Sequence, residues 1–184
     1  KGTSSPGGSS RIRSLMKVAT LWFERTLQVQ RRISNTSAGT SMRFNAEVLR
    51  CDYKIGIGSI VPHPFSGFGG GSKIILPGVA SIETIDSNHT RLFPHPTAGI
   101  GKYEGNILKM DMNEAARMAG LDVKVDCIYN LKRQVTHLFV GDVVDEHVEG
   151  VKVAREYWAT DWVPDCDIVV ANCFSKAMPC LPVQ

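Results

Sequence analysis

The chain lacks any cysteine pair of the C-x-x-C kind and any long apolar run, and both absences narrow what it can be. Its five cysteines are scattered through 184 residues, which argues against a disulfide framework or a thiolate zinc site. No apolar run reaches the ~18–20 residues of a membrane span. No apolar core followed by a small-residue cleavage site opens the chain, so we expect no secretory leader. These absences predict a cytoplasmic protein with no membrane partner.

Charge is unevenly distributed along the chain, although the net charge is only +3. Residues 1–34 carry seven Lys and Arg against one acid, whereas residues 35–184 carry fourteen against seventeen acids. The body of the chain is therefore not a polyanion binder, and we expect no nucleic-acid partner. The composition, 43% hydrophobic and 21% charged, excludes wholesale disorder and leaves enough apolar residues for a core.

Residues 1–34 form a basic, low-complexity segment that differs in texture from the rest of the chain. Residues 1–10 (KGTSSPGGSS) are typical of a flexible start. Residues 11–33 are basic, and their spaced apolar positions predict a helix. A surface helix or a non-native extension is favoured over a membrane-binding helix for this stretch.

Residues 35–171 alternate strand and helix patterns. Strands are expected over residues 53–58, 123–129, 134–140 and 166–171. Helices are expected from the capping box Asp111-x-x-Glu114 to Gly120, and again after Asp142. This order predicts an α/β fold, a mixed sheet flanked by helices. Residues 172–184 are then expected to be the truncated start of a second lobe.

An acidic run accompanies the last predicted helix. Asp142 is placed to cap this helix, and Asp145, Glu146 and Glu149 are expected to form a solvated face.

The chemistry-bearing residues concentrate in residues 62–78, PHPFSGFGGGSKIILPG. Gly67 and the run Gly69, Gly70 and Gly71 let the backbone approach a ligand, and their N–H groups can face an anion. Lys73 lies just after this loop and can pair with phosphate or act as a covalent handle. The Walker A pattern fails, because it requires Gly directly before the Lys and Ser or Thr directly after. The dinucleotide fingerprint fails as well, because its glycine register is different.

Two histidines flank the glycine loop. His63 precedes Lys73 by ten residues and His89 comes sixteen residues after it. Histidine suits proton transfer near neutral pH and binds borderline metals. One histidine alone cannot hold a transition metal tightly, so a metal here would need further ligands from a cofactor.

These residues resemble the nickel-dependent lactate racemase family, whose members carry a nickel-pincer nucleotide. The resemblance runs from about residue 35 to about residue 171 and includes NTSAGTSMRFN, the loop PH-x-F-x-G-x-x-GG-x-K, the pair NH at residues 88–89 and FVGDVVDEHVEG. It implies the N-terminal catalytic domain of a two-lobed isomerase that racemises or epimerises a small 2-hydroxy acid by reversible hydride transfer.

The resemblance also implies roles for individual residues. His63 would be a catalytic acid or base, and Lys73 would carry the pyridinium thioamide mononucleotide. His89 would be the fourth ligand of nickel beside three donors of the cofactor. Phe65 would lie near the cofactor ring. The stretch Gly69, Gly70, Gly71 and Ser72 would hold the nucleotide phosphate or shape the loop that bears the lysine.

The chain also departs from the family pattern. A second catalytic histidine is expected upstream, but the five histidines are at 63, 89, 95, 137 and 147. The lobe that completes the substrate pocket is missing too. We therefore expect an incomplete member, with a second lobe or a complementary chain as its partner and little activity on its own. Two alternatives stay open: a catalytically inactive fragment, and a phosphate- or nucleotide-binding protein that uses the glycine loop.

Overall fold

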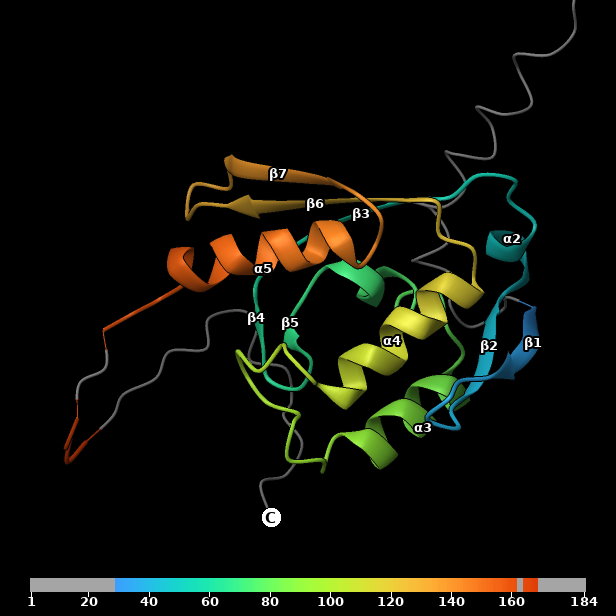
Figure 1. The fold of residues 1–184 in the computed structure, drawn as a ribbon, viewed down its shortest axis with the longest axis horizontal. Helices are drawn as coiled ribbons and strands as arrows, with labels where there is room; N and C mark the ends of the chain where they lie inside the picture. The colour runs from blue at the N-terminus through green and yellow to red at the C-terminus, as the bar shows by residue number, and fades with distance from the viewer. Residues whose placement is uncertain (1–28, 162–163, 169–184) are drawn as a thin grey trace, which may run out of the picture.

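A sheet of three strands in the order β3–β6–β7 lies along one side of the fold (Figure 1). The structure is a computed structural model, and it describes residues 29–161 and 164–168. β3 (Ile55–Ser59) runs parallel to β6 (Val123–Tyr129), which runs antiparallel to β7 (Val135–Gly141). This mixed sheet, with helices beside it, confirms the predicted α/β class.

The helices lie on one side of this sheet. α5 (Asp145–Tyr157) runs alongside β6 and β7, and α4 (Ile107–Met118) and α3 (Ile82–Leu92) lie below it (Figure 1). Asn106 caps α4, because its side chain accepts a hydrogen bond from the Lys109 N–H at 3.0 Å. The short helix α2 (Ala46–Leu49) comes directly after a peripheral hairpin.

Two hairpins and a 3-10 turn complete the described chain. β1 (Gln30–Asn35) pairs antiparallel with β2 (Ser41–Asn45) at the periphery. β4 (Pro62–His63) and β5 (Gly67–Phe68) form a tight antiparallel pair. The glycine run then enters η1 (Gly71–Ile74), which lies against β3 and α4. The residues singled out in the sequence therefore lie on consecutive tight turns, between the sheet and α4.

Two buried apolar clusters hold these elements together. The larger joins β2, η1, α3 and α4, and it includes Met42, Phe44, Leu76, Leu108 and Met112. The smaller lies between the sheet and α5, and it includes Ile60, Phe68, Ile128, Val151 and Ala154. Burying a side chain of this kind contributes roughly 1.5–3 kcal/mol.

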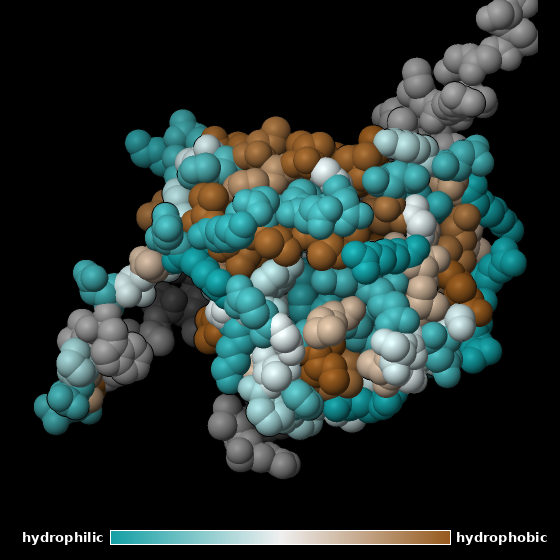
Figure 2. Space-filling view, viewed as in Figure 1, coloured by the Kyte–Doolittle hydropathy of each residue, from teal (hydrophilic) through white to brown (hydrophobic). Residues whose placement is uncertain are grey.

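The two faces of the β3–β6–β7 sheet have opposite character. Lys124, Asp126 and Ile128 alternate along β6 on the inner face and are fully buried. The outer face exposes aliphatic side chains, with Ile57 71%, Leu138 62% and Val140 60% exposed. Figure 2 shows apolar residues at the molecular surface on the side where the β3–β6–β7 sheet lies. The polar positions of β6 are therefore the buried ones.

Several predicted elements are confirmed and one helix start is wrong. β3, β6 and β7 agree with three of the strands expected from the sequence, and Gly120 lies just past α4 at φ +68°. However, α4 begins at Ile107, so Asp111 lies inside the helix and caps nothing. Its buried carboxylate accepts hydrogen bonds instead, from Thr36, Thr40 and Asn88 at 2.5, 2.9 and 2.7 Å.

Two terminal predictions are wrong where the structure describes them. The helix expected over residues 11–33 does not include its last residues, because β1 starts at Gln30; residues 11–28 lie outside the described chain. The strand expected over residues 166–171 is not formed over 166–168, and 169–171 lie outside the described residues. Within the described part of the chain, no helix has the length and apolar character needed to span a bilayer.

The expected solvated acidic face on the last helix is also wrong at one position. Glu146 is 5% exposed. It falls on the inward stripe of α5 with His147, Gly150, Val151 and Ala154. By contrast, Asp142 accepts hydrogen bonds from the N–H groups of Val144 and Asp145 at 2.8 and 3.3 Å, as expected of a residue at a helix start.

Candidate functional site

His63 ends β4 and is held by the turn directly after it. Its Nδ1 lies 3.2 and 3.3 Å from the N–H groups of Phe65 and Ser66, and 3.1 Å from the Ser66 hydroxyl. Since both N–H groups donate to Nδ1, the neutral ring carries its proton on Nε2. Burial, together with the positive charges of Lys73, His89 and Lys109, lowers the pKa of His63 to about 4.

His89 lies in the last turn of α3 with one ring nitrogen already engaged. Its Nδ1 is 3.0 Å from the carbonyl oxygen of Ile85. A carbonyl only accepts, so Nδ1 carries the proton and Nε2 keeps a lone pair. The preceding residue, Asn88, is buried and donates to Asp111 of α4 at 2.7 Å, which fixes α3 against α4. Burial lowers the pKa of His89, which keeps the ring neutral and able to bind a metal.

Lys73 lies in η1, half-buried, at the end of the glycine run. Burial lowers the pKa of its ammonium to about 8. A fraction of the side chain is then a neutral amine near pH 7–8, which is the form able to attack an acyl carbon. Lys73 also borders a cavity of about 330 Å³ lined by Gly58, Gly70, Gly71, Gly78 and Lys124, among others.

Phe65 brings the two histidines into one site. Its ring centroid lies 5.7 Å from that of His63 and 6.3 Å from that of His89, with both pairs edge-on. Phe93, at the end of α3, supports it from behind at 4.3 Å. His63, Phe65, Lys73 and His89 therefore gather around one half-buried position, although 26 residues separate the first from the last in the sequence.

The glycine run makes its contacts with the protein itself. The N–H of Gly69 donates to the Val61 carbonyl at 2.7 Å, and the N–H of Gly71 donates to Asp126 at 2.5 Å. The Ser72 hydroxyl donates to Asn113 at 2.7 Å. Two of the loop N–H groups expected to face an anion are thus engaged elsewhere, which counts against the phosphate-binding alternative.

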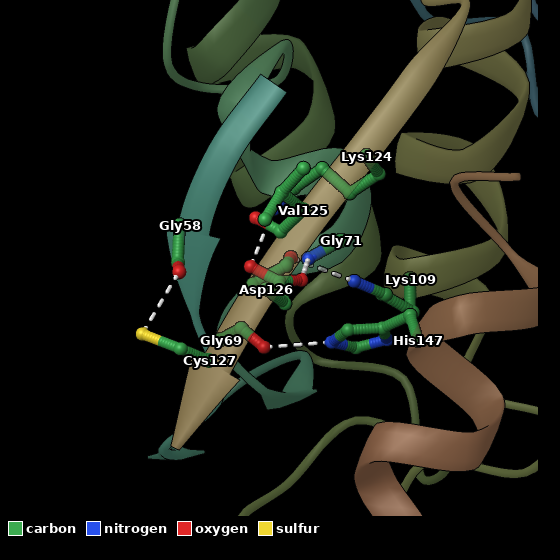
Figure 3. A network of polar contacts seen from close by, with 10 residues as sticks. Gly58, Gly69, Gly71, Lys109, Lys124, Val125, Asp126, Cys127 and His147 are labelled. Atoms are coloured by element: carbon green, nitrogen blue, oxygen red, sulfur yellow. Dashed lines mark hydrogen bonds and ion pairs between the residues drawn. The ribbon is translucent and has the colours of Figure 1, made fainter. Parts of the chain in front are cut away.

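Sequence reasoning missed a group of buried charged residues directly behind the loop. They are Lys109, Lys124, Asp126 and Glu146, and none is more than 5% exposed. Figure 3 shows three of them with His147 around Gly69 and Gly71. Alternation places Lys124 and Asp126 on one face of β6, but only the packing of α5 and η1 shows that this face is the buried one.

The remaining histidines lie away from this position. His95 and His137 are exposed. His147 is buried, and its Nε2 donates to the Gly69 carbonyl at 2.7 Å while Nδ1 accepts from the Tyr103 hydroxyl at 3.2 Å. Over the residues that the structure describes, no three His, Cys, Asp or Glu side chains cluster in a way that could hold a metal. Any metal at His89 therefore needs donors from outside this part of the chain.

Comparison with known sequences shows which proteins the chain is similar to. Residues 24–101 match the family model described as the lactate racemase N-terminal domain. Lactate racemase of Thermoanaerobacterium thermosaccharolyticum is 31% identical over 141 residues, and that of Lactiplantibacillus plantarum is 32% identical over 142 residues. These alignments cover 76% and 77% of this chain but 33% of each relative, so the chain spans a third of their length.

Solved structures give the same result. The lactate racemase apoprotein from T. thermosaccharolyticum superposes with a TM-score of 0.65 at 30% identity, covering 67% of this chain and 30% of that chain. A protein from Thermotoga maritima superposes with a TM-score of 0.58 at 18% identity, covering 73% of this chain and 38% of that one. The second likeness shows the fold alone. The resemblance found in the sequence is thus confirmed.

Proposed function

Given that the chain belongs to the lactate racemase family through its N-terminal-type domain, we propose that it contributes the catalytic half-site of a racemase or epimerase of 2-hydroxy acids. The observation that supports this is the convergence of His63, Lys73 and His89 around Phe65. A base, an amine of lowered pKa and a metal-binding imidazole at one position suit cofactor-dependent isomerisation better than phosphate binding.

The residues fit a nickel-bearing nucleotide tethered to a lysine. The Lys73 amine is half-buried, with a pKa lowered to about 8, and its charge acts on both His63 and His89. His89 offers one free imidazole nitrogen, and the described chain offers no further ligand set, so the remaining donors would come from the cofactor. The chemistry that such a group supplies is the reversible uptake of hydride from the substrate Cα.

His63 handles the proton of the substrate hydroxyl in this proposal. With the loop N–H groups on Nδ1, the neutral ring holds a proton on Nε2, from which it can donate a hydrogen bond to a substrate oxygen. To take the hydroxyl proton at Nε2, the ring must carry its own proton on Nδ1, where the Ser66 hydroxyl oxygen 3.1 Å away can accept it but the two loop N–H groups oppose it. Ser66 is fully buried, so its hydroxyl stays beside Nδ1.

A cytoplasmic location is part of the same proposal, because the sequence carries scattered thiols and no C-x-x-C pair. The substrate would be a small 2-hydroxy acid. Residues beyond this chain would complete its pocket, since the matched part of the chain covers only 33% of each relative.

The test is the mass of the peptide that contains Lys73, after co-expression with enzymes that make the nickel cofactor. We expect an adduct on that peptide and about one nickel per modified chain. Lys73→Arg should abolish the adduct, whereas Lys152→Arg, at an exposed position on α5, should keep it. His89→Ala should keep the adduct and lose the nickel.

An unmodified Lys73 would contradict the proposal if a full-length lactate racemase became loaded in the same host. That result would favour the catalytically inactive alternative. Phosphate binding that is lost in Lys73→Ala without any involvement of nickel would favour the phosphate-binding alternative instead.

A further inference from the structure

Charged side chains lie where an apolar core is expected, behind the loop that bears Lys73. Lys124 and Asp126 are 0% exposed, Lys109 is 2% exposed and Glu146 is 5% exposed. Buried charges are costly unless they are paired and hydrogen-bonded. A fold that retains four of them beside one loop therefore needs a reason beyond stability.

Each glycine of the run is held by one of these buried groups or by His147. Asp126 accepts from the Gly71 N–H at 2.5 Å and from the Lys124 ammonium. The Lys109 ammonium donates to the Gly70 carbonyl at 3.2 Å. His147 donates to the Gly69 carbonyl at 2.7 Å. Figure 3 shows these groups meeting the loop from β6, α4 and α5.

The contacts are too close for any residue but glycine. A Cβ on Gly70 would lie 2.7 Å from the Asp126 carboxylate, and one on Gly71 would lie 2.7 Å from the His147 ring. Both glycines also have positive φ, +80° and +54°. The loop is therefore fitted to the buried groups behind it.

Glu146 is the member without a visible partner. Both of its oxygens are buried, and neither has a hydrogen-bond partner among the described residues. It forms no ion pair with Lys109 or Lys124, although both lie near it. Its other neighbour is the Asp126 carboxylate, and two ionised carboxylates cannot hydrogen-bond, whereas a protonated Glu146 can donate to Asp126.

We propose that Asp126 and Glu146 share one proton and act together as positioning residues, which fix the loop at Gly69, Gly70 and Gly71 and thereby Lys73. This inference rests on the proposed function in one respect: that function is what gives the position of Lys73 a role.

The charged and titratable groups that face Glu146 come from each packed element: Asp126 and Lys124 from β6, Lys109 from α4 and Tyr103 from the loop before α4. Burial and the Asp126 charge raise the pKa of Glu146 to about 8. Loss of the proton above that pH places two carboxylates side by side, which weakens the Asp126 contact with Gly71. The loop should therefore loosen in mild alkali.

Amide hydrogen exchange of the peptide around residues 66–76 tests this without nickel or cofactor. In the unmodified chain, we expect the protection factor, corrected for intrinsic exchange, to fall by about tenfold between pH 7 and pH 9, the effect of one pKa unit of lost interaction. Glu146→Gln supplies a permanent neutral donor, so protection should be retained at pH 7 and fall less by pH 9. Any fall that remains would come from Lys109, which donates to the Gly70 carbonyl and whose pKa burial lowers to about 7. Glu149→Gln is the matched control, because Glu149 lies on the same helix, is exposed and pairs with Lys152; it should behave like the unmodified chain.

A flat profile in the unmodified chain would overturn the proposal, as would a Glu146→Gln profile that falls as steeply as the unmodified one. If Glu146→Gln does not fold, infrared titration of the unmodified chain still decides, because ordinary carboxyls are ionised by pH 6.5. A carboxyl signal that disappears above pH 6.5 supports the shared proton, and its absence overturns it. If Lys73 is not loaded with cofactor but the exchange profile is as expected, the proposed function is contradicted. The proposal that Asp126 and Glu146 position the loop is not.

Discussion

On the inner face of the β3–β6–β7 sheet, β6 presents Lys124 and Asp126, whereas on the outer face β3 and β7 present Ile57 and Leu138 to solvent. A two-sided sheet in water normally does the opposite, with apolar residues inside and polar residues outside. The inner charges hydrogen-bond to the glycine run, whereas the outer aliphatic side chains are mostly exposed to solvent. The residues of the inner face are thus explained by the loop they support, whereas those of the outer face are explained by their strand propensity.

The removal of one inner charge is expected to change the unfolding free energy most. Asp126→Ala leaves the Lys124 ammonium buried without its partner and the Gly71 N–H without its acceptor. Breaking a buried ion pair from one side costs about 3–5 kcal/mol. We expect a loss of unfolding free energy of that size, measured by urea denaturation at pH 7.

A loss below about 1 kcal/mol, the scale of an exposed ion pair, would contradict the assignment of Asp126 to a dry interior. Glu47→Ala, which removes the exposed pair with Arg50, serves as the control.

The second largest effect on stability is expected from acid, through the buried His147 and the half-buried His63. Burial lowers the pKa of His147 to about 2 and that of His63 to about 4. Both groups therefore bind protons more readily in the unfolded chain, so their contribution to stability is complete above about pH 6.5 and is lost as the pH falls below it. Each contributes a slope of up to about 1.4 kcal/mol per pH unit.

Denaturation at pH 7.5 and pH 5 measures this slope. His147→Gln should be less stable at pH 7.5, because it loses the Gly69 and Tyr103 contacts, yet its stability should depend less on pH. His137→Gln, at an exposed position on β7, should keep the full slope. Equal slopes in the His147 variant and the unmodified chain would show that His147 accepts a proton in the folded state.

The outer face should respond least. Leu138→Thr keeps strand propensity and removes aliphatic surface that is already 62% exposed, so unfolding free energy should change by less than about 0.5 kcal/mol. Its neighbour Phe139 packs against the α5 cluster, and Phe139→Thr should cost about 2 kcal/mol or more. Equal costs for the two variants, measured by urea denaturation, would mean that the outer face is covered in solution.

The sequence allowed several of the elements to be predicted from residue spacing, and the resemblance to the lactate racemase family pointed to His63, Lys73 and His89 as one site. Alternation located β6 and β7, and the tight turns around Gly67 and the glycine run bring His63 and Lys73 together. The sequence did not allow the buried charges of the inner face to be predicted. Alternation along β6 defines two faces, but which one is buried depends on where α5 and η1 pack, and no local pattern records that.

The start of α4 shows the same limit at a smaller scale. Asp111 and Glu114 have the spacing of a capping box, yet Asn106 caps the helix one turn earlier. Asp111 is instead the acceptor for Thr36, Thr40 and Asn88, a long-range role that local chemistry could not reveal. Local spacing identifies a residue able to cap, and tertiary contacts decide whether it does.

The pairing of β1 with β2 has a practical consequence for anyone who wishes to trim the chain. β1 begins at Gln30, and the Val29 carbonyl accepts from the Ala46 N–H at 2.9 Å, so this strand lies partly ahead of the boundary that charge composition suggests at residue 34. A chain cut at that boundary would turn β2 into a bare edge beside the fully buried Met42 and Phe44. Bare edges of this kind recruit strands from other molecules. A cleavage site placed before Val29 avoids that aggregation, whereas one placed at residue 34 invites it.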